Sequence, residues 1–122
     1  MISHHFIQKA KANENWKWSF ATGENAQVVC MTISTKTNPK NEIGKETHSF
    51  DQVILVIEGS GIAELNGKTS SVDTGDMIFI PQGTVHNVVN SEEKALKIIS
   101  FYSSNDMPSN TMYKTKKDEV AS

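Results

Sequence analysis

The chain has 122 residues, a formal net charge of −2 at pH 7 and a single cysteine. This length suits one domain with a substantial core and is too short for two ordinary domains. The charge balance is not basic, so we expect no nucleic-acid partner. The longest apolar run, Val53 to Ile57, is far too short for a membrane span. The lone Cys30 excludes a disulfide framework within the chain and favours a reducing, cytoplasmic location.

All twelve basic residues are lysine, and arginine is absent. The chain therefore has no guanidinium group, the planar side-chain group that binds a carboxylate or a phosphate at two points. We expect any bound anion to be held by lysine side chains, backbone N–H groups or a metal ion.

The N-terminal segment, residues 1–15, is polar and is predicted to be a frayed terminus. It lacks a basic start followed by an apolar stretch, so no signal peptide is expected. His4 and His5 stand together in it, but no further metal-ligating residues lie near them in the sequence.

The pattern that follows is one of short strands and turns. Large aromatic residues alternate with polar ones over 16–20, which is typical of a half-buried strand, and residues 27–33 are β-branched and apolar. Residues 34–41 are predicted to be a loop. Further strands are predicted over residues 52–58, 62–65, 68–72, 77–80, 85–90 and 95–102.

The turns between these strands fix the fold class. Asn66-Gly67 between two extended runs is a strong hairpin signal, because both turn residues need a positive φ. No long helix is predicted, and the tail over 103–122 is polar and expected to be solvated. We therefore predict one all-β domain over residues 1–122, a sandwich or barrel built from about residue 16 to residue 102.

The strand over 52–57 is apolar on both faces beyond Gln52. Both faces should therefore be covered. The second face has to be covered by the N-terminal aromatic strand, by another subunit or by both, and we favour a homodimer.

Three residues of the central region could carry chemistry. Glu46 and His48 share parity with Gln52 on what should be a strand entering Val53, and His86 lies on a separate strand. Two imidazoles and a carboxylate that converge inside a barrel can hold a divalent metal ion. The alternative is that each histidine is a hydrogen-bonded core or surface residue.

Residues 75–90 resemble the second motif of the cupin family. That motif has glycine, proline, glycine, histidine and asparagine at fixed spacings, and every one is matched here: Gly75, Pro81, Gly83, His86 and Asn90. The first cupin motif is matched in part, because Glu46 stands at its first histidine and Gln52 at its glutamate, while His48 and Gly59 fit. Lys40 replaces the glycine that usually opens it. The resemblance spans about residues 27–102. The chain is similar to small bacterial cupins that are often labelled mannose-6-phosphate isomerase-like.

The resemblance implies a double-stranded β-helix, the cupin jelly-roll barrel, with a metal site inside. It implies His48 and His86 as ligands directly, and Glu46 and Gln52 by position. The set of Glu46, His48 and His86 is similar to the two-histidine, one-carboxylate set of iron(II) oxygenases. Gln52 offers only a neutral amide oxygen, so weaker binding or an empty site is expected relative to the full set. The metal could be iron, manganese, nickel or zinc.

Three functions remain open at this point. The chain could be a metal-dependent enzyme acting on a small molecule, isomerase-like or iron(II) dioxygenase-like. It could be a non-enzymatic protein that binds a sugar or another small molecule, or a structural protein with a vestigial cavity. An isomerase needs a proton shuttle, and Glu46 is less free to act as a base if it is a metal ligand.

Overall fold

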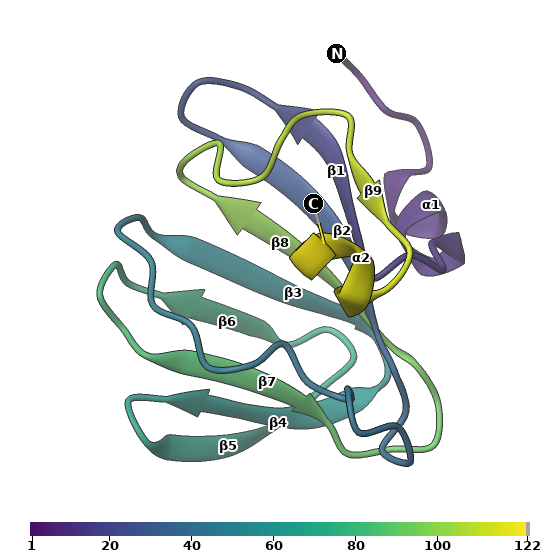
Figure 1. Cartoon of the computed structure of the whole chain (residues 1–122), viewed down its shortest axis with the longest axis vertical. Helices are drawn as coiled ribbons and strands as arrows, with labels where there is room; N and C mark the ends of the chain where they lie inside the picture. The colour runs from purple at the N-terminus through teal and green to yellow at the C-terminus, as the bar shows by residue number, and fades with distance from the viewer. Residues whose placement is uncertain (122) are drawn as a thin grey trace.

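The computed structural model describes residues 1–121 of the chain, which form mainly β-strands with a short helix near each end (Figure 1). No helix in this range is long and apolar enough to cross a membrane. The elements are α1 (Phe6–Ala12), β1 (Lys17–Thr22), β2 (Gln27–Ile33), β3 (Gln52–Glu58), β4 (Ser60–Leu65), β5 (Lys68–Asp73), β6 (Met77–Ile80), β7 (His86–Asn90), β8 (Leu96–Tyr102), β9 (Met112–Tyr113) and α2 (Lys116–Ala121).

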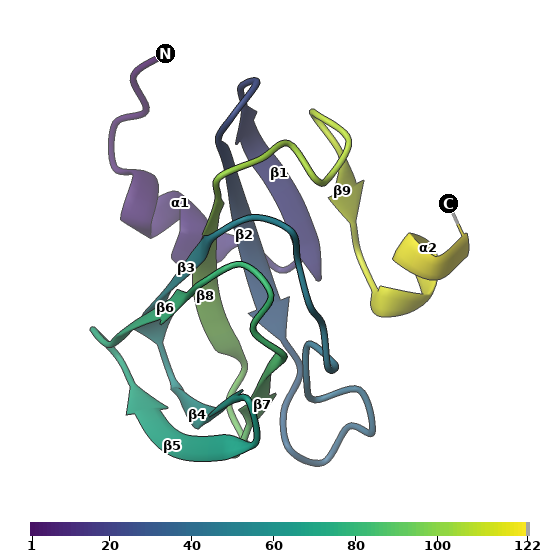
Figure 2. The same cartoon turned by 90° about the vertical axis from the view of Figure 1, so that its left-hand side faces the viewer.

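The strands form two antiparallel sheets. The first has six strands in the order β6-β3-β8-β2-β1-β9, and the second has three in the order β5-β4-β7. The smaller sheet lies at the bottom of Figure 1, and Figure 2 shows α1 and α2 on opposite sides of the β1–β2 pair. The predicted all-β fold class is confirmed.

The strand boundaries follow the sequence pattern closely. The bounds of β2, β3 and β6 agree with the prediction at both ends, and the other predicted strands differ by one or two residues. The hairpin between β4 and β5 turns at Asn66 and Gly67, whose φ values are 49° and 83°. Both angles lie in the left-handed region that the two-residue hairpin requires.

The main core lies between the two sheets. Alternate residues of β3, including Ile54 and Val56, point into it with no exposed surface. They meet residues of the smaller sheet such as Ala63 and Val88 in one cluster of buried side chains. Both sheets are therefore half-buried, with the apolar side chains at every second position.

The N-terminal segment packs on the outer face of the larger sheet, so the predicted frayed terminus is wrong. Ala10 of α1 is buried in a second cluster with Cys30, Ile57 and Ile99. The partly buried residues around this cluster include aromatic side chains from α1 and β1 (Phe6, Trp18 and Phe20). This cluster supplies the cover that the second apolar face of β3 needed.

The segment before β3 is not the continuous strand that the parity argument assumed. Residues 42–51 form a loop that touches the smaller sheet at two isolated bridges, Glu42 with Val89 and Glu46 with His86. Glu46 and His48 therefore reach the barrel from a loop that runs beside β7.

The C-terminal tail also differs from the prediction of a solvated segment. β9 pairs with β1, and Met107 and Tyr113 pack against the main core. The Gln27 side chain exchanges two hydrogen bonds with the Met107 backbone, so the segment after β8 is tied back to β2. Ser122, the last residue of the predicted tail, lies outside the described residues.

Candidate metal centre

The backbone places Glu46 opposite His86. The Glu46 N–H donates to the His86 carbonyl over 3.0 Å, and the His86 N–H donates to the Glu46 carbonyl over 2.9 Å. These two bonds join the loop to the first residue of β7. Both side chains are thus fixed to the edge of the smaller sheet.

His48 is held by the loop that precedes β7. The Gly83 N–H donates to the His48 carbonyl over 2.8 Å. Gly83 has a φ of 81°, in the region that favours glycine, so the sequence of this loop suits the turn that directs its N–H toward His48. The second cupin-like motif therefore positions a residue of the first.

The structure brings three of the predicted residues together. One ligand atom from each of Glu46, His48 and His86 can be chosen so that all lie within 4.8 Å of one another. The His48 Nε2 atom lies 2.9 Å from the Glu46 Oε2 atom. Among the described residues this is the one such group found, and His4 and His5 take no part in it.

The ring of His86 has one satisfied and one unsatisfied nitrogen. Its Nδ1 atom lies 2.9 Å from the Thr84 carbonyl oxygen, which can only accept, so Nδ1 carries the proton and donates it. In the neutral ring Nε2 then holds a lone pair. Nε2 is buried without a hydrogen-bond partner among the described residues, and His86 is only 1% exposed. This is the tautomer that a metal ligand needs, held by a backbone carbonyl.

Gln52, on the larger sheet, also has a buried polar atom without a hydrogen-bond partner among the described residues. Its Nε2 atom lies 3.3 Å from the Ser100 hydroxyl oxygen, whereas its Oε1 atom is buried without a partner in the described part of the chain. Gln52 is paired in register with Tyr102, whose ring lies 6.0 Å from the His48 ring. Its side chain is 3% exposed on the strand face that points into the barrel.

Aromatic contacts fix the orientation of His48. Its ring stacks on Phe50 with centroids 4.6 Å apart, and Phe50 meets Tyr102 edge-on at 5.3 Å. The His48 and His86 rings lie 5.2 Å apart. Neither histidine is turned outward to water, as the His48 side chain is only 15% exposed.

Two groups at the centre have perturbed pKa values. Burial raises the pKa of Glu46, but the hydrogen bond with His48 and the charge of Lys17 lower it, and the net effect is a pKa below the usual range. Burial and the charge of Glu46 raise the pKa of Tyr102. At neutral pH the centre therefore holds an ionised carboxylate beside a phenol that keeps its proton.

The side chains fit a divalent metal ion. A buried imidazole lone pair, a second imidazole, a carboxylate and an unpartnered amide oxygen are all suitable donors. Two ligands bonded at about 2.1 Å to one ion lie at most about 4.2 Å apart. The spread of 4.8 Å therefore has to close by at least about 0.6 Å, and by about 1.4 Å for tetrahedral ligation, where the ligands lie about 3.4 Å apart.

Residues 35–102 match the cupin domain family, which is more than half of the chain. The chain is a cupin. The crystal structure of BH2720 from Bacillus halodurans is similar to it over 99% of this chain and 94% of that one, with 30% sequence identity and a TM-score of 0.92. KdgF from a Halomonas species shares the fold at 24% identity and a TM-score of 0.64, over 74% and 79% of the two chains. The predicted double-stranded β-helix is confirmed.

Two curated relatives of this cupin are uncharacterised. YrkC of Bacillus subtilis is 32% identical over 91% of this chain, and L612 of Acanthamoeba polyphaga mimivirus is 35% identical over 71% of it. The aligned parts amount to 61% and 55% of those two proteins. The cupin described here thus matches just over half of the length of each.

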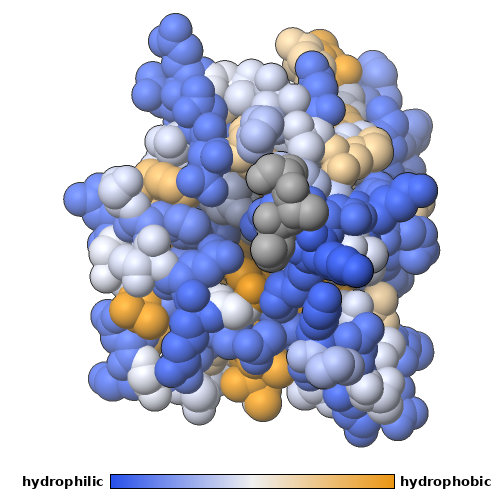
Figure 3. Space-filling model, viewed as in Figure 1, coloured by the Kyte–Doolittle hydropathy of each residue, from blue (hydrophilic) through white to orange (hydrophobic). Residues whose placement is uncertain are grey.

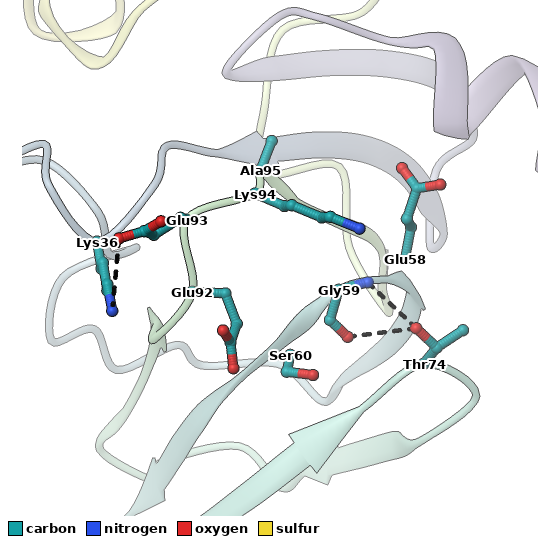
Figure 4. A pocket seen from close by; sticks show the side chains of 9 residues that line it. All are labelled: Lys36, Glu58, Gly59, Ser60, Thr74, Glu92, Glu93, Lys94 and Ala95. Carbon is teal, nitrogen blue, oxygen red and sulfur yellow. Dashed lines mark hydrogen bonds and ion pairs between the residues drawn. The ribbon is translucent and has the colours of Figure 1, made fainter.

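One hollow of this cupin, of about 940 Å³, is lined by residues other than Glu46, His48 and His86. Figure 4 shows its lining, in which Lys36 and Glu93 form an ion pair at 3.9 Å and Thr74 bonds to the Gly59 backbone. It adjoins the loop after β7, whereas His86 begins β7. Its charged side chains face water, where each remains hydrated.

Sequence reasoning missed the residues that surround the centre. Tyr102 and Ser100 share the inward face of β8 with the core, a pattern that alternation along 95–102 could have revealed. Lys17 could not have been found in this way. It lies on β1, far from Glu46 in the sequence, and its charge acts on Glu46 only in the folded chain.

Proposed function

We propose that this cupin binds one divalent metal ion through Glu46, His48 and His86, with Gln52 as a fourth and weaker ligand, and that it binds or transforms a small molecule at that ion. The observation that carries the proposal is the buried His86 Nε2 lone pair, which has no partner among residues 1–121. A buried polar atom costs free energy unless something satisfies it. A metal ion is a partner suited to this atom and to the neighbouring carboxylate.

When bound, the ion would supply a positive charge that polarises a carbonyl or binds an anionic oxygen of the ligand. The residues of the chain do the rest. Thr84 holds the His86 proton on Nδ1, and Phe50 keeps the His48 ring in place. The raised pKa of Tyr102 suits a hydrogen-bond donor to the ligand and not a base.

A non-enzymatic binding protein is the second candidate. The Glu46 carboxylate is already bonded to His48, and its pKa is lowered, so it is a poor proton acceptor at neutral pH. This favours binding, or chemistry led by the metal, over an isomerase-like proton shuttle. The mannose-6-phosphate isomerase-like label has no independent support.

The test is the metal content of protein purified without chelator, measured by elemental analysis. We expect close to one equivalent of iron, manganese, nickel or zinc, and background levels in His48→Ala. A wild-type protein without metal that also ignores these ions in a thermal-shift assay would contradict the proposal. It would leave the binding and structural alternatives.

A homodimer remains part of the proposal. Apolar side chains stay exposed on the outer face of the larger sheet beyond α1, with Met77 at 60%, Phe79 at 52% and Phe101 at 37%. Phe79 and Phe101 both pair in register with Val53, so they form one row across β6, β3 and β8. Such a patch suits a second copy of the chain. A monomer mass by light scattering at micromolar concentration would contradict this. The cytoplasmic location stays a prediction.

A further inference from the structure

Two hollows flank the start of α2 and share lysine side chains. One of about 530 Å³ and one of about 460 Å³ are both lined by Lys40, Lys116 and Lys117, and the larger also by Lys114 and Trp16. We call this region the lysine cleft, defined by its four lysines. α2 lies in front of β2 and β3 in Figure 1, and hydrophilic side chains dominate this side of the molecule in Figure 3. Hollows of this size match those that hold small molecules.

More basic than acidic side chains line the cleft. Its acidic lining residues are Glu14 and Glu119, and each pairs with a lysine outside the lining, Lys97 at 3.7 Å and Lys17 at 2.8 Å. None of the four cleft lysines has an ion pair of its own in the part of the chain that the structure describes. The excess of positive charge is confined to this region, since the whole chain has a net charge of −2. Converging charges of one sign concentrate a ligand of the opposite sign.

Lys116 of the cleft lies beside the loop that carries Glu46. Its ammonium group donates to the Glu42 carbonyl and lies 5.0 Å from the centroid of the Trp16 ring. It also lies 4.0 Å from where a Cβ atom would stand on Gly44, two residues before Glu46. The cleft and the centre therefore share the loop that carries Glu46.

The electrostatics of Lys116 agree with this geometry. Burial lowers its pKa, and the nearby carboxylates of Glu42 and Glu46 raise it by less, so the net direction is down. An anion bound beside Lys116 would favour its charged form.

We infer that the lysine cleft binds the carboxylate or phosphate group of a small-molecule ligand whose remaining part reaches the metal centre. Arginine is absent from the chain, so lysines have to supply the cationic side chains for such a group. The inference rests on the proposed function, because it names the ligand class for that centre. It adds that the ligand is an anion and that its charged end lies against α2.

The experiment uses the fluorescence of Trp16, which lines the cleft. In the full chain with Trp18→Phe, Trp16 is the only tryptophan. Inorganic phosphate and succinate are titrated separately at constant ionic strength, after a chelator has been applied and removed. We expect a saturable change in emission, and the probe with the lower midpoint identifies the charged group.

The cleft variant is Lys40→Gln with Lys117→Gln, because both side chains are exposed and neither makes a side-chain hydrogen bond or ion pair in the described structure. The matched control is Lys11→Gln with Lys68→Gln, which removes the same charge from exposed positions on α1 and β5. We expect the cleft variant to raise the midpoint about three- to tenfold. The control should change it by less than about twofold, since its lysines lie outside the cleft.

Three outcomes would overturn the inference: no saturable change with either probe, equal weakening in the cleft variant and the control, or no weakening in the cleft variant. The metal content of each variant is measured alongside. A protein without metal that still binds phosphate through the cleft lysines would contradict the proposed function and leave the anion site. Normal metal content without anion binding would contradict only the inference.

Discussion

The two ends of β7 each carry a buried polar side chain, and these two side chains have different surroundings. Asn90, with no exposed surface, has its Nδ2 atom within 3.2 Å of three backbone carbonyl oxygens, and its Oδ1 atom accepts from the Glu92 N–H. His86, at 1% exposed, uses only Nδ1. Both residues belong to the same motif, yet both polar atoms of the Asn90 side chain have partners, whereas the His86 Nε2 atom has none in the part of the chain that the structure describes.

Under the proposed function, the difference separates a structural role from a binding role. The partners of Asn90 lie on the segments that follow β2 and β7, so its side chain joins two loops at one end of the barrel. His86 and Gln52 each keep one buried atom without a partner in the described structure. A polar group of the first kind stabilises the fold, whereas the proposed function assigns the two of the second kind to a metal ion.

The largest effect is expected from His86→Ala on metal content. Removing a direct ligand should weaken metal affinity by at least about 100-fold, since even the residues that orient a ligand contribute 10- to 100-fold. Elemental analysis should show background metal. Thermal denaturation of the metal-free variant should resemble that of the metal-free wild type. Full retention of metal in this variant would show that His86 is a buried core residue after all.

Asn90→Ala should show the opposite profile. It leaves three carbonyl groups without the amide that joins them, and we expect a loss of about 2–4 kcal/mol in the free energy of unfolding by urea. Metal content per folded molecule should not change. Asn87→Ala is the matched control, because Asn87 accepts a single hydrogen bond from Gly44, and it should cost about 1 kcal/mol.

The strands could be predicted because their information is local. Alternation over β1 to β8 places apolar residues on the core face, and Asn66-Gly67 fixes one hairpin register. The centre could also be predicted, because the spacing of the motif with Gly83 and His86 matches a known family. Sequence reasoning therefore found the barrel and the residues that converge inside it.

The ends of the chain could not be predicted, because tertiary contacts stabilise them. His5 precedes α1 in a left-handed conformation without a side-chain cap, so nothing local marks the start of the helix. The helix is held by Ala10 on the sheet and by the Lys97 ammonium, which donates to the Asn13 carbonyl. Short helices depend on such packing. The lysine cleft could not be predicted for the same reason, because β1 and α2 meet only in the folded chain.

A smaller effect is expected from Gln52→Glu, which tests whether the second unsatisfied atom belongs to the centre. A carboxylate in place of the amide adds an anionic ligand, so metal affinity should rise about tenfold. Competition with a chromophoric chelator measures the change. If affinity falls, Gln52 is not close to the ion, and its unpartnered Oε1 needs another explanation.

The smallest effect is expected at the surface of the Asn90 end, at Asp73, the last residue of β5. The backbone N–H of Thr74 and the hydroxyl of Ser60 lower the pKa of Asp73 below its ordinary value of 3.8. The ionised form is thus favoured in the folded state, and its contribution to stability is fully present above pH 3.8. It is lost as the pH falls through the lower, folded-state value.

Asp73→Asn should therefore lower the free energy of unfolding by a nearly constant amount at neutral and mildly acidic pH. The difference from wild type should shrink below pH 3.8, where the wild-type carboxylate is protonated as well. Urea unfolding across this range measures it, with Glu24→Gln at an exposed turn position as the control for charge removal. A difference that grows toward low pH would show that the turn does not favour the ionised carboxylate. The polar groups at this end of the barrel would then not be matched to one another as those around Asn90 are.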